Sequence, residues 1–322
     1  MGCKHPSETR SWRCVAMGAL FSMFTTAAIV VASPPPPFDG QRAFADLKAV
    51  CDIGPRISGA EGMAKQQKLL VDHFTALGAK CAFQEFDVAH PESGSPVRLK
   101  NLIVSWQPES TERVLIACHY DTRPYPDREP LPRNRKAAFI GANDGGSGVA
   151  LLMELGRQMS TLKPRYGVDF VFFDAEELIY NSDRDKYFLG SEYFARNYVD
   201  SPPGHRYVAG VVLDMVADKD LRIYYEVYSL RYARAVTDSV WAAADRIGAK
   251  QFMARRKYEV RDDHLPLNEI AKIPTCDVID FDYPHWHTRN DIPANCSAES
   301  LAVVGRVMLA WLSDLPDFAA KR

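Results

Sequence analysis

The chain has 322 residues, of which 47% are hydrophobic, enough to bury a full core as one large domain. Its formal net charge is -2, so its charge gives no reason to expect nucleic-acid binding. Charges of both signs are spread along the chain without a long single-sign block, which is typical of an ordinary solvated surface.

Residues 1–37 are predicted to be a targeting segment. Basic residues precede an uncharged run over residues 15–33, whose length is near the roughly 20 residues that span a bilayer. The basic flank and the small residues Ala32 and Ser33 are typical of a cleavable signal peptide. Pro34 hinders cleavage and favours an uncleaved anchor with a stiff proline spacer. Both alternatives predict an exported protein, either periplasmic or membrane-anchored and facing the non-cytoplasmic side.

Residues 38–322 are predicted to form one catalytic domain in which helices and strands alternate. Helical spacing of apolar residues marks the helices, and short, nearly continuous apolar runs mark the strands. In chain order the elements are helix 62–78, strands 100–106 and 113–121, helix 145–159, strands 168–177 and 208–216, helix 229–248, strand 273–281 and helix 297–315. Such runs are typical of strands covered on both faces. We therefore expect an α/β fold, a single globular domain with a central mixed, largely parallel β-sheet covered by helices on both faces.

Polar residues fall where the predicted strands end. His119 and Asp121 follow "VLIAC", Glu176 and Glu177 follow "VFFDA", Asp214 follows "AGVVL", and His287 comes shortly after "DVIDFDYP". Ligands of open α/β sheets bind outside the carboxyl ends of the strands, so we expect these side chains to converge there.

A metal site is the interpretation that accounts for this set best. Asp144 lies in the glycine-rich "GANDGGSG", where the backbone can approach a ligand closely. Together with His119, Glu177, Asp214 and His287 it offers nitrogen and carboxylate donors, which suit a catalytic zinc. Glu176 and Glu177 would repel each other unless one of them binds the metal, which leaves the other to exchange protons. Each of these residue types, taken alone at such a position, is more often a turn, capping or packing residue. The support for a metal site comes from all five residues falling at or just after the ends of predicted strands or in the glycine-rich loop.

Other catalytic classes are less well supported. Ser191 lies in "LGSEY", but the chain has no GxSxG motif. Cys118 and His119 are adjacent in a predicted strand, so their side chains point to opposite faces. The sequence contains neither a GxGxxG nor a P-loop motif.

The seven cysteines include no CxxC pair, which argues against a thiolate zinc site. An exported context permits disulfides, but the five cysteines after residue 37 are an odd number and do not reveal a pairing. Buried free thiols are the alternative.

Seven motifs occur in the order seen in the zinc exopeptidase superfamily, which contains both aminopeptidases and glutaminyl cyclases. They are "ACHYDTRPY", "GANDGGSG", "FFDAEE", "YFLGSEYFAR", "LDMV", "DDHLP" and "YPHWHTRND", and the match covers roughly residues 97–315. The chain most resembles the bacterial glutaminyl cyclases related to the animal enzymes, which convert an N-terminal glutamine to pyroglutamate with release of ammonia.

The resemblance implies one zinc ion held by Asp144, Glu177 and His287. It implies Glu176 as the general acid and base, and Asp214 and Asp262 as a supporting acidic network. It also implies that Trp286 forms part of the wall of the pocket for the glutamine side chain. Val149 stands at the position of the animal enzymes' second bridging cysteine, so Cys118 is not expected to form that disulfide.

The aminopeptidase branch of the same superfamily is the alternative. There, His119 and Asp214 would hold a second zinc and Glu176 would activate a bridging water. Asp121, like His119, is a candidate either for binding a second metal or for supporting the metal ligands from behind. For the cyclase, the expected partners are peptides and proteins with N-terminal glutamine. "DDHLP" with Asp262, and Trp286 directly before His287, favour the cyclase.

Overall fold

The computed structural model describes residues 1–3 and 38–318. The uncharged run over residues 15–33 lies outside the described residues. Within them, no helix combines the length and the apolar character needed to cross a bilayer.

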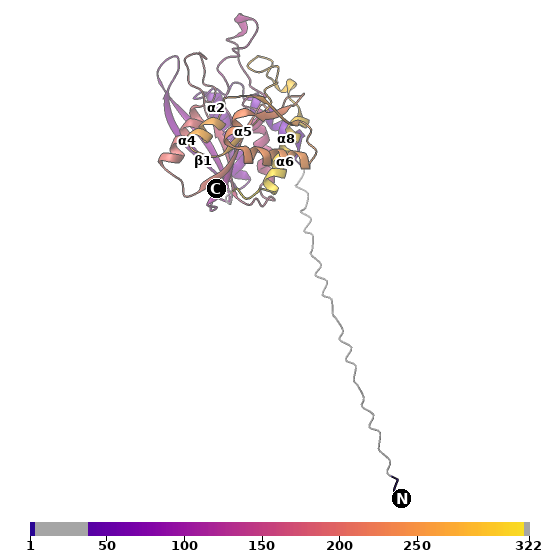
Figure 1. Ribbon diagram of the computed structural model, residues 1–322. Coiled ribbons are helices and arrows are strands. Elements are labelled where there is room, and N and C mark those ends of the chain that lie inside the picture. Colours follow the sequence, from indigo (N-terminus) through magenta and orange to yellow (C-terminus); the bar gives the residue numbers. More distant parts are fainter. Residues whose placement is uncertain (4–37, 319–322) are drawn as a thin grey trace. The chain divides into compact units, whose positions relative to one another are not determined.

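A six-stranded mixed sheet forms the centre of the domain (Figure 1). Its strand order is β1-β2-β4-β3-β5-β8, in which β4, β3, β5 and β8 run parallel while β1 and β2 join as an antiparallel hairpin. Strands β6 and β7 pair separately. The strands are β1 (Lys80–Ala89), β2 (Pro96–Trp106), β3 (Glu112–His119), β4 (Gly167–Phe173), β5 (Arg206–Asp214), β6 (Ile223–Glu226), β7 (Phe252–Tyr258) and β8 (Thr275–Ile279).

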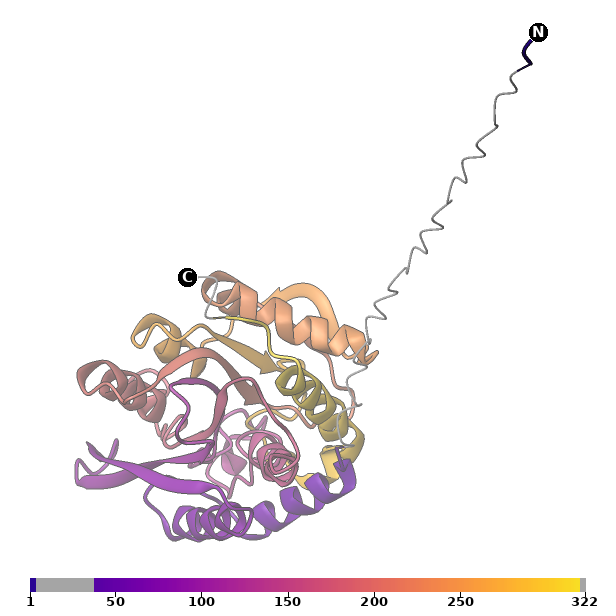
Figure 2. The same cartoon turned by 90° about the horizontal axis from the view of Figure 1, so that it is seen from below.

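Helices cover both faces of this sheet (Figure 2). The α-helices are α1 (Gly40–Asp52), α2 (Glu61–Ala76), α3 (Ser147–Gln158), α4 (Leu189–Asp200), α5 (Val227–Tyr232), α6 (Arg234–Arg246), α7 (His264–Glu269) and α8 (Ala298–Ser313). Short 3-10 turns span Pro132–Asn134 and Pro293–Asn295.

The side chains of β3 show how the two faces are divided. Val114 and Ile116 pack into the core with α1, α2, α3, α6 and α8, whereas Leu115 and Ala117 pack into a second core with α4 and α7. Alternation with a period of two along a strand buried on both faces explains why its sequence reads as a continuous apolar run. The predicted fold class is confirmed.

Two local expectations need correction. Residues 229–248 do not form one helix, because Ala233 has φ -134° and ψ 37° and separates α5 from α6. Strand β1 was not expected, since only Phe86 among its residues is buried and its sequence therefore carries no apolar run. The predicted last helix is confirmed, and the Ser297 side chain caps it by accepting a hydrogen bond from the Ser300 N–H.

The described cysteines are all free thiols, and Cys51, Cys118, Cys276 and Cys296 are buried. Cys118 forms no disulfide, as expected. Its side chain instead lies under α3, where a Cβ atom at Gly148 would be 2.6 Å from the Cys118 Cβ. The glycine thus lets α3 pack closely on the sheet.

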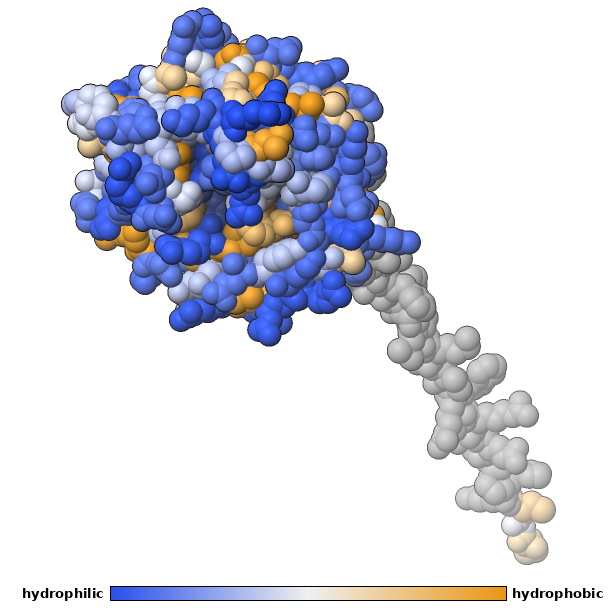
Figure 3. Space-filling view, turned by 90° about the horizontal axis from the view of Figure 1, so that it is seen from above, coloured by the Kyte–Doolittle hydropathy of each residue, from blue (hydrophilic) through white to orange (hydrophobic). Residues whose placement is uncertain are grey.

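Hydrophilic residues cover most of the face seen in Figure 3, and apolar residues appear there in small groups. This is the solvated surface that the charge distribution predicts.

Candidate active site

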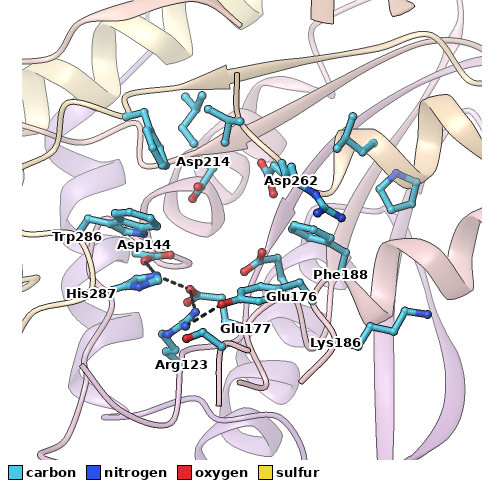
Figure 4. A pocket seen from close by; sticks show the side chains of 18 of the residues that line it. Arg123, Asp144, Glu176, Glu177, Lys186, Phe188, Asp214, Asp262, Trp286 and His287 are labelled. Atoms are coloured by element: carbon cyan, nitrogen blue, oxygen red, sulfur yellow. Dashed lines mark hydrogen bonds and ion pairs between the residues drawn. The ribbon is translucent and has the colours of Figure 1, made fainter. Parts of the chain in front are cut away.

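The strands bring the polar residues to the wall of one cavity of about 860 Å³ or, for His119, directly behind that wall. His119 is the last residue of β3 and Asp214 the last of β5, while Glu176 and Glu177 closely follow β4. His287 follows β8, and Asp144 precedes α3. Figure 4 shows the carboxylates of the labelled residues turned toward one another across this cavity. The cavity is lined by Asp144, Glu176, Glu177, Asp214, Asp262, Trp286 and His287, among others.

Asp144, Glu177 and His287 form a group of possible metal ligands in the cavity wall. All three are buried, and one ligand atom from each lies within 4.8 Å of the others. The His287 Nε2 atom is 2.7 Å from Glu177 Oε1 and 3.5 Å from Asp144 Oδ2. The second oxygen of Glu177 and the Oδ2 of Asp144 have no hydrogen-bond partner among the described residues. Buried carboxylate oxygens without a hydrogen-bond partner are suited to bind a cation. The combination of one imidazole nitrogen and two carboxylates suits zinc.

The ionisation of these ligands reflects their mutual contact. Burial raises the pKa of Asp144 to about 6, helped by the charge of Glu177. Burial opposes ionisation of Glu177 as well, but the His287 ring and the Arg123 charge lower its pKa to about 2. Burial would lower the pKa of His287, yet Glu177 and Asp127 raise it to about 9. At neutral pH the group therefore sets two carboxylates against one imidazolium, and its net negative charge suits a bound cation.

The backbone is held in unusual conformations at this site. Ala175, Met215 and His287 have φ values of 56°, 49° and 56°, in the left-handed region that non-glycine residues rarely occupy. Each lies within two residues of, or is itself, a predicted site residue. Such conformations cluster at functional sites, where the surrounding structure fixes them.

Gly145 allows the glycine-rich loop to lie close against the end of β3. Its φ is 74°, and a Cβ atom there would lie 2.4 Å from the Asp121 carbonyl oxygen and 3.1 Å from the His119 ring. Only glycine combines this conformation with so close a backbone approach.

Asp121 holds the paired glutamates from behind. Its Oδ1 accepts a hydrogen bond from the Glu176 N–H at 3.1 Å, and its Oδ2 accepts one from the Glu177 N–H at 3.0 Å. The side chain is fully buried. It therefore fixes the turn that aims Glu177 at His287 and Glu176 into the cavity.

Glu176 is the protonatable carboxyl of the cavity. It is 9% exposed, and burial followed by the charge of Glu177 raises its pKa well above the ordinary value. The raised pKa favours the protonated form of the Glu176 carboxyl, and a carboxyl that can hold and release a proton at this position suits a general acid or base.

His119 lies behind the cavity wall among three carboxylates. Its Nε2 is 3.2 Å from Asp144 and 3.3 Å from Asp214, and its Nδ1 is 3.5 Å from Asp121. Burial opposes protonation, but these contacts raise the pKa of His119 well above its usual value. His119, Asp144 and Asp214 also satisfy the spacing of a metal-ligand group. A protonated imidazole or a second cation would each offset part of the negative charge of these carboxylates.

Asp262 faces the cavity at the start of α7. Burial and the charge of Asp214 raise its pKa to about 6. Behind it, His264 and Asp277 are fully buried and complete a further group whose donor atoms lie within 4.8 Å of one another. The acidic wall thus continues into the protein interior.

Trp286 forms the aromatic wall of the cavity. Its ring centre is 4.3 Å from that of His287 and 4.8 Å from that of Phe281. The guanidinium carbon of Arg128 lies 3.8 Å from the Trp286 ring centre on the rim.

Two residues that sequence reasoning missed support the ligands. Asp127 Oδ1 lies 3.0 Å from His287 Nδ1, on the side of the ring opposite the metal-facing nitrogen. Arg123 donates hydrogen bonds to Glu177 at 3.1 Å, to Asp127 at 2.9 Å and to the Tyr187 hydroxyl at 3.1 Å. Carboxylates that hold a metal-binding imidazole from behind fix its orientation. Both residues lie in the loop that follows "HYD", and no periodicity or spacing distinguishes them from ordinary loop residues.

The chain matches the model of peptidase family M28 over residues 101–312. It is similar to the solved structure of Fimbriiglobus ruber glutaminyl cyclase, with 42% identity and a TM-score of 0.83 over 87% of this chain and 98% of that one. It is also similar to a Zn-dependent exopeptidase from Parabacteroides distasonis, with 31% identity and a TM-score of 0.81 over 87% and 99% of the two chains.

A curated relative, the glutaminyl-peptide cyclotransferase of Boiga irregularis, is 25% identical over 244 residues, which is 66% of this chain and 64% of the relative. The chain thus matches slightly less than two thirds of that relative's length. The residues matched by the family model include the whole cavity lining and strands β3, β4, β5 and β8 of the central sheet. The chain therefore belongs to peptidase family M28, and within it to the family of the bacterial glutaminyl cyclases.

Proposed function

We propose that the chain is a zinc-dependent glutaminyl cyclase, which converts the N-terminal glutamine of peptides and proteins to pyroglutamate and releases ammonia. The observation that carries the proposal is the Trp286 ring packed 4.3 Å from the ring of His287 in the cavity wall. An apolar surface beside the metal ligands suits the methylene groups of a glutamine side chain and excludes competing water. The 42% identity to a bacterial glutaminyl cyclase supports the same choice.

In this proposal, Asp144, Glu177 and His287 hold one zinc ion. When bound, zinc polarises the γ-carbonyl of the substrate glutamine and stabilises negative charge on its oxygen. Arg123 and Asp127 keep Glu177 and His287 in place through the contacts described above. The likeness to a Zn-dependent exopeptidase supports the choice of metal.

Glu176 moves the proton. The substrate α-amine bonds to the γ-carbon, and the bond from that carbon to the side-chain amide nitrogen breaks. Glu176 takes a proton from the attacking amine and delivers one to the departing nitrogen, which leaves as ammonia. Every peptide bond remains intact. The cavity accelerates the reaction by holding the glutamine curled, with its amine close to the γ-carbon.

The acidic residues around Glu176 bind the amine. Asp214 and Asp262 line the cavity on the side of Glu176, where their oxygens can accept hydrogen bonds from the neutral α-amine that attacks. Protonated His119, held by Asp121, Asp144 and Asp214, would supply the positive charge that a second metal supplies in the two-zinc alternative. That alternative, an aminopeptidase, is favoured by one observation, the metal-ligand spacing of His119, Asp144 and Asp214.

We also propose that residues 1–37 export the protein, as a signal peptide or as a membrane anchor, and that residues 38–322 form the catalytic domain. The basic flank and uncharged run of the sequence support this proposal. Peptides and proteins outside the cytoplasm with N-terminal glutamine would then be its substrates.

The proposal is tested by Glu176→Gln, which preserves the shape of the side chain but removes proton transfer. Zinc content should be unchanged, while ammonia release from a glutamine peptide should fall by about 10²–10⁴-fold. Glu192→Gln is the matched control, because Glu192 lines the same cavity but pairs with Lys186 and Arg196. Near-normal turnover by a zinc-loaded Glu176→Gln protein would remove Glu176 from the reaction.

A further inference from the structure

The charges on the rim of the cavity are unequally partnered. Each rim carboxylate has a cationic, hydroxyl or backbone partner: Asp127, Asp185, Glu192, Glu259 and Glu269. Among the rim cations, Arg123, Arg184 and Lys186 are paired with carboxylates. Within the described part of the chain, no ion pair involves the two that remain, Arg128 and Arg261, and both are exposed. Arg128 and Arg261 are therefore the rim cations without an ion-pair partner among the described residues, while Glu259 and Glu269 accept hydrogen bonds from tyrosine hydroxyls only.

Arg128 is the better placed of the two cations. Its backbone N–H donates to the carbonyl oxygen of His287 at 3.1 Å, which ties it to a predicted metal ligand. Its guanidinium stacks on the Trp286 ring, with the guanidinium carbon 3.8 Å from the ring centre. Stacking orients a guanidinium and leaves its N–H donors free at the edges, where they match the geometry of a carboxylate.

The cavity thus has carboxylates at its base, and at its rim the Arg128 guanidinium lies over Trp286 without an ion-pair partner among the described residues. The α-amine of a substrate would meet Glu176, Asp214 and Asp262, and the next part of the chain would leave the cavity past Trp286. We propose that Arg128 binds a carboxylate of the substrate, supplied by an acidic side chain on the residue after the N-terminal glutamine. This inference rests on the proposed cyclase function and names the substrates that it prefers. A terminal carboxylate of a dipeptide presents the same chemistry at nearly the same place.

The test compares kcat/KM for amidated peptides that begin Gln-Glu, Gln-Gln or Gln-Lys. The Gln-Glu peptide should exceed the Gln-Lys peptide by about fivefold to tenfold, as expected for one partly exposed charge-assisted contact. The ratio should shrink in 0.5 M salt, because screening weakens exposed pairs. In Arg128→Gln the ratio should approach one. Arg133→Gln, which removes an exposed charge on the same loop away from the cavity, should preserve it.

A second arm separates the two carboxylate sources. Gln-Ala with a free terminus is compared with the Gln-Ala amide. The wild type could prefer the free acid over the amide but show no preference for Gln-Glu over Gln-Lys. If Arg128→Gln abolished that preference for the free acid, the carboxylate bound by Arg128 would be the terminal one, and the side-chain assignment would be overturned. Equal rates in both arms, or preferences that survive Arg128→Gln, would overturn the role of Arg128. Failure to cyclise even the neutral Gln-Gln peptide would instead contradict the proposed function.

Discussion

Asp127 provides a quantitative test of how the metal ligands are held. Asp127→Asn removes a negative charge that faces His287 Nδ1 at 3.0 Å and Arg123 at 2.9 Å. An asparagine oxygen can replace one of these contacts but not both. Loss of such a supporting carboxylate typically weakens metal affinity by about 10–100-fold. The Asp127 side chain is 38% exposed, so water screens part of the interaction, and we expect a value near tenfold, or about 1.4 kcal/mol.

The assay is competition for zinc between the protein and a chelator of known affinity, with bound zinc as the readout. Asp183→Asn is the matched control, since Asp183 is exposed on the neighbouring loop and lies outside the cavity lining. Wild-type zinc affinity in a folded Asp127→Asn protein would refute the role of Asp127 behind His287. An equal loss in both variants would mean that the effect is not specific to this contact.

Three further predictions concern the loop, the buried acid and the number of metal ions. Gly145→Ala should destabilise the protein by a few kcal/mol in urea unfolding, because its Cβ would lie 2.4 Å from a carbonyl oxygen, whereas Gly204→Ala meets open space and should change little. Burial, then the Asp121 charge, raises the pKa of Asp174 to about 7, so the folded state binds a proton that the unfolded chain releases near pH 4. The free energy of unfolding should therefore fall between about pH 4 and 7, by at most about 4 kcal/mol from this group, and Asp174→Asn should remove that slope; a slope unchanged in the variant would contradict the assignment. Elemental analysis should find about one zinc per chain in both the wild type and His119→Ala. Two zinc ions per chain in the wild type and one in His119→Ala would favour the two-zinc alternative.

The central sheet was predictable because strands buried on both faces leave a direct signal in sequence. The run ending at His119 is apolar at every position from Val114 to Cys118, since its side chains enter two cores in turn. The same geometry fixes where each strand ends, which is why polar residues at those ends could be expected to converge. The structure brings Asp144, Glu177 and His287 together as that reasoning expects.

The remainder was not predictable because it depends on contacts between distant segments. Asp127 meets His287 across 160 residues of sequence, and nothing in its local pattern marks it as different from Asp183. Strand β1 exposes most of its side chains at the edge of the sheet, so it lacks the apolar run that reveals the others. The break at Ala233 follows from the separate packing of α5 and α6, while the apolar spacing of the sequence continues across it.

The most direct test of the central claim is mass spectrometry of two synthetic peptides incubated with the zinc-loaded protein. A peptide that begins with glutamine should lose the mass of one ammonia molecule and nothing else, because the α-amine attacks the side-chain amide and leaves the peptide bonds intact. A peptide that begins with leucine should remain unchanged, since it has no γ-amide for zinc to polarise. Release of free leucine or free glutamine at comparable rates would contradict the account and identify the chain as an aminopeptidase.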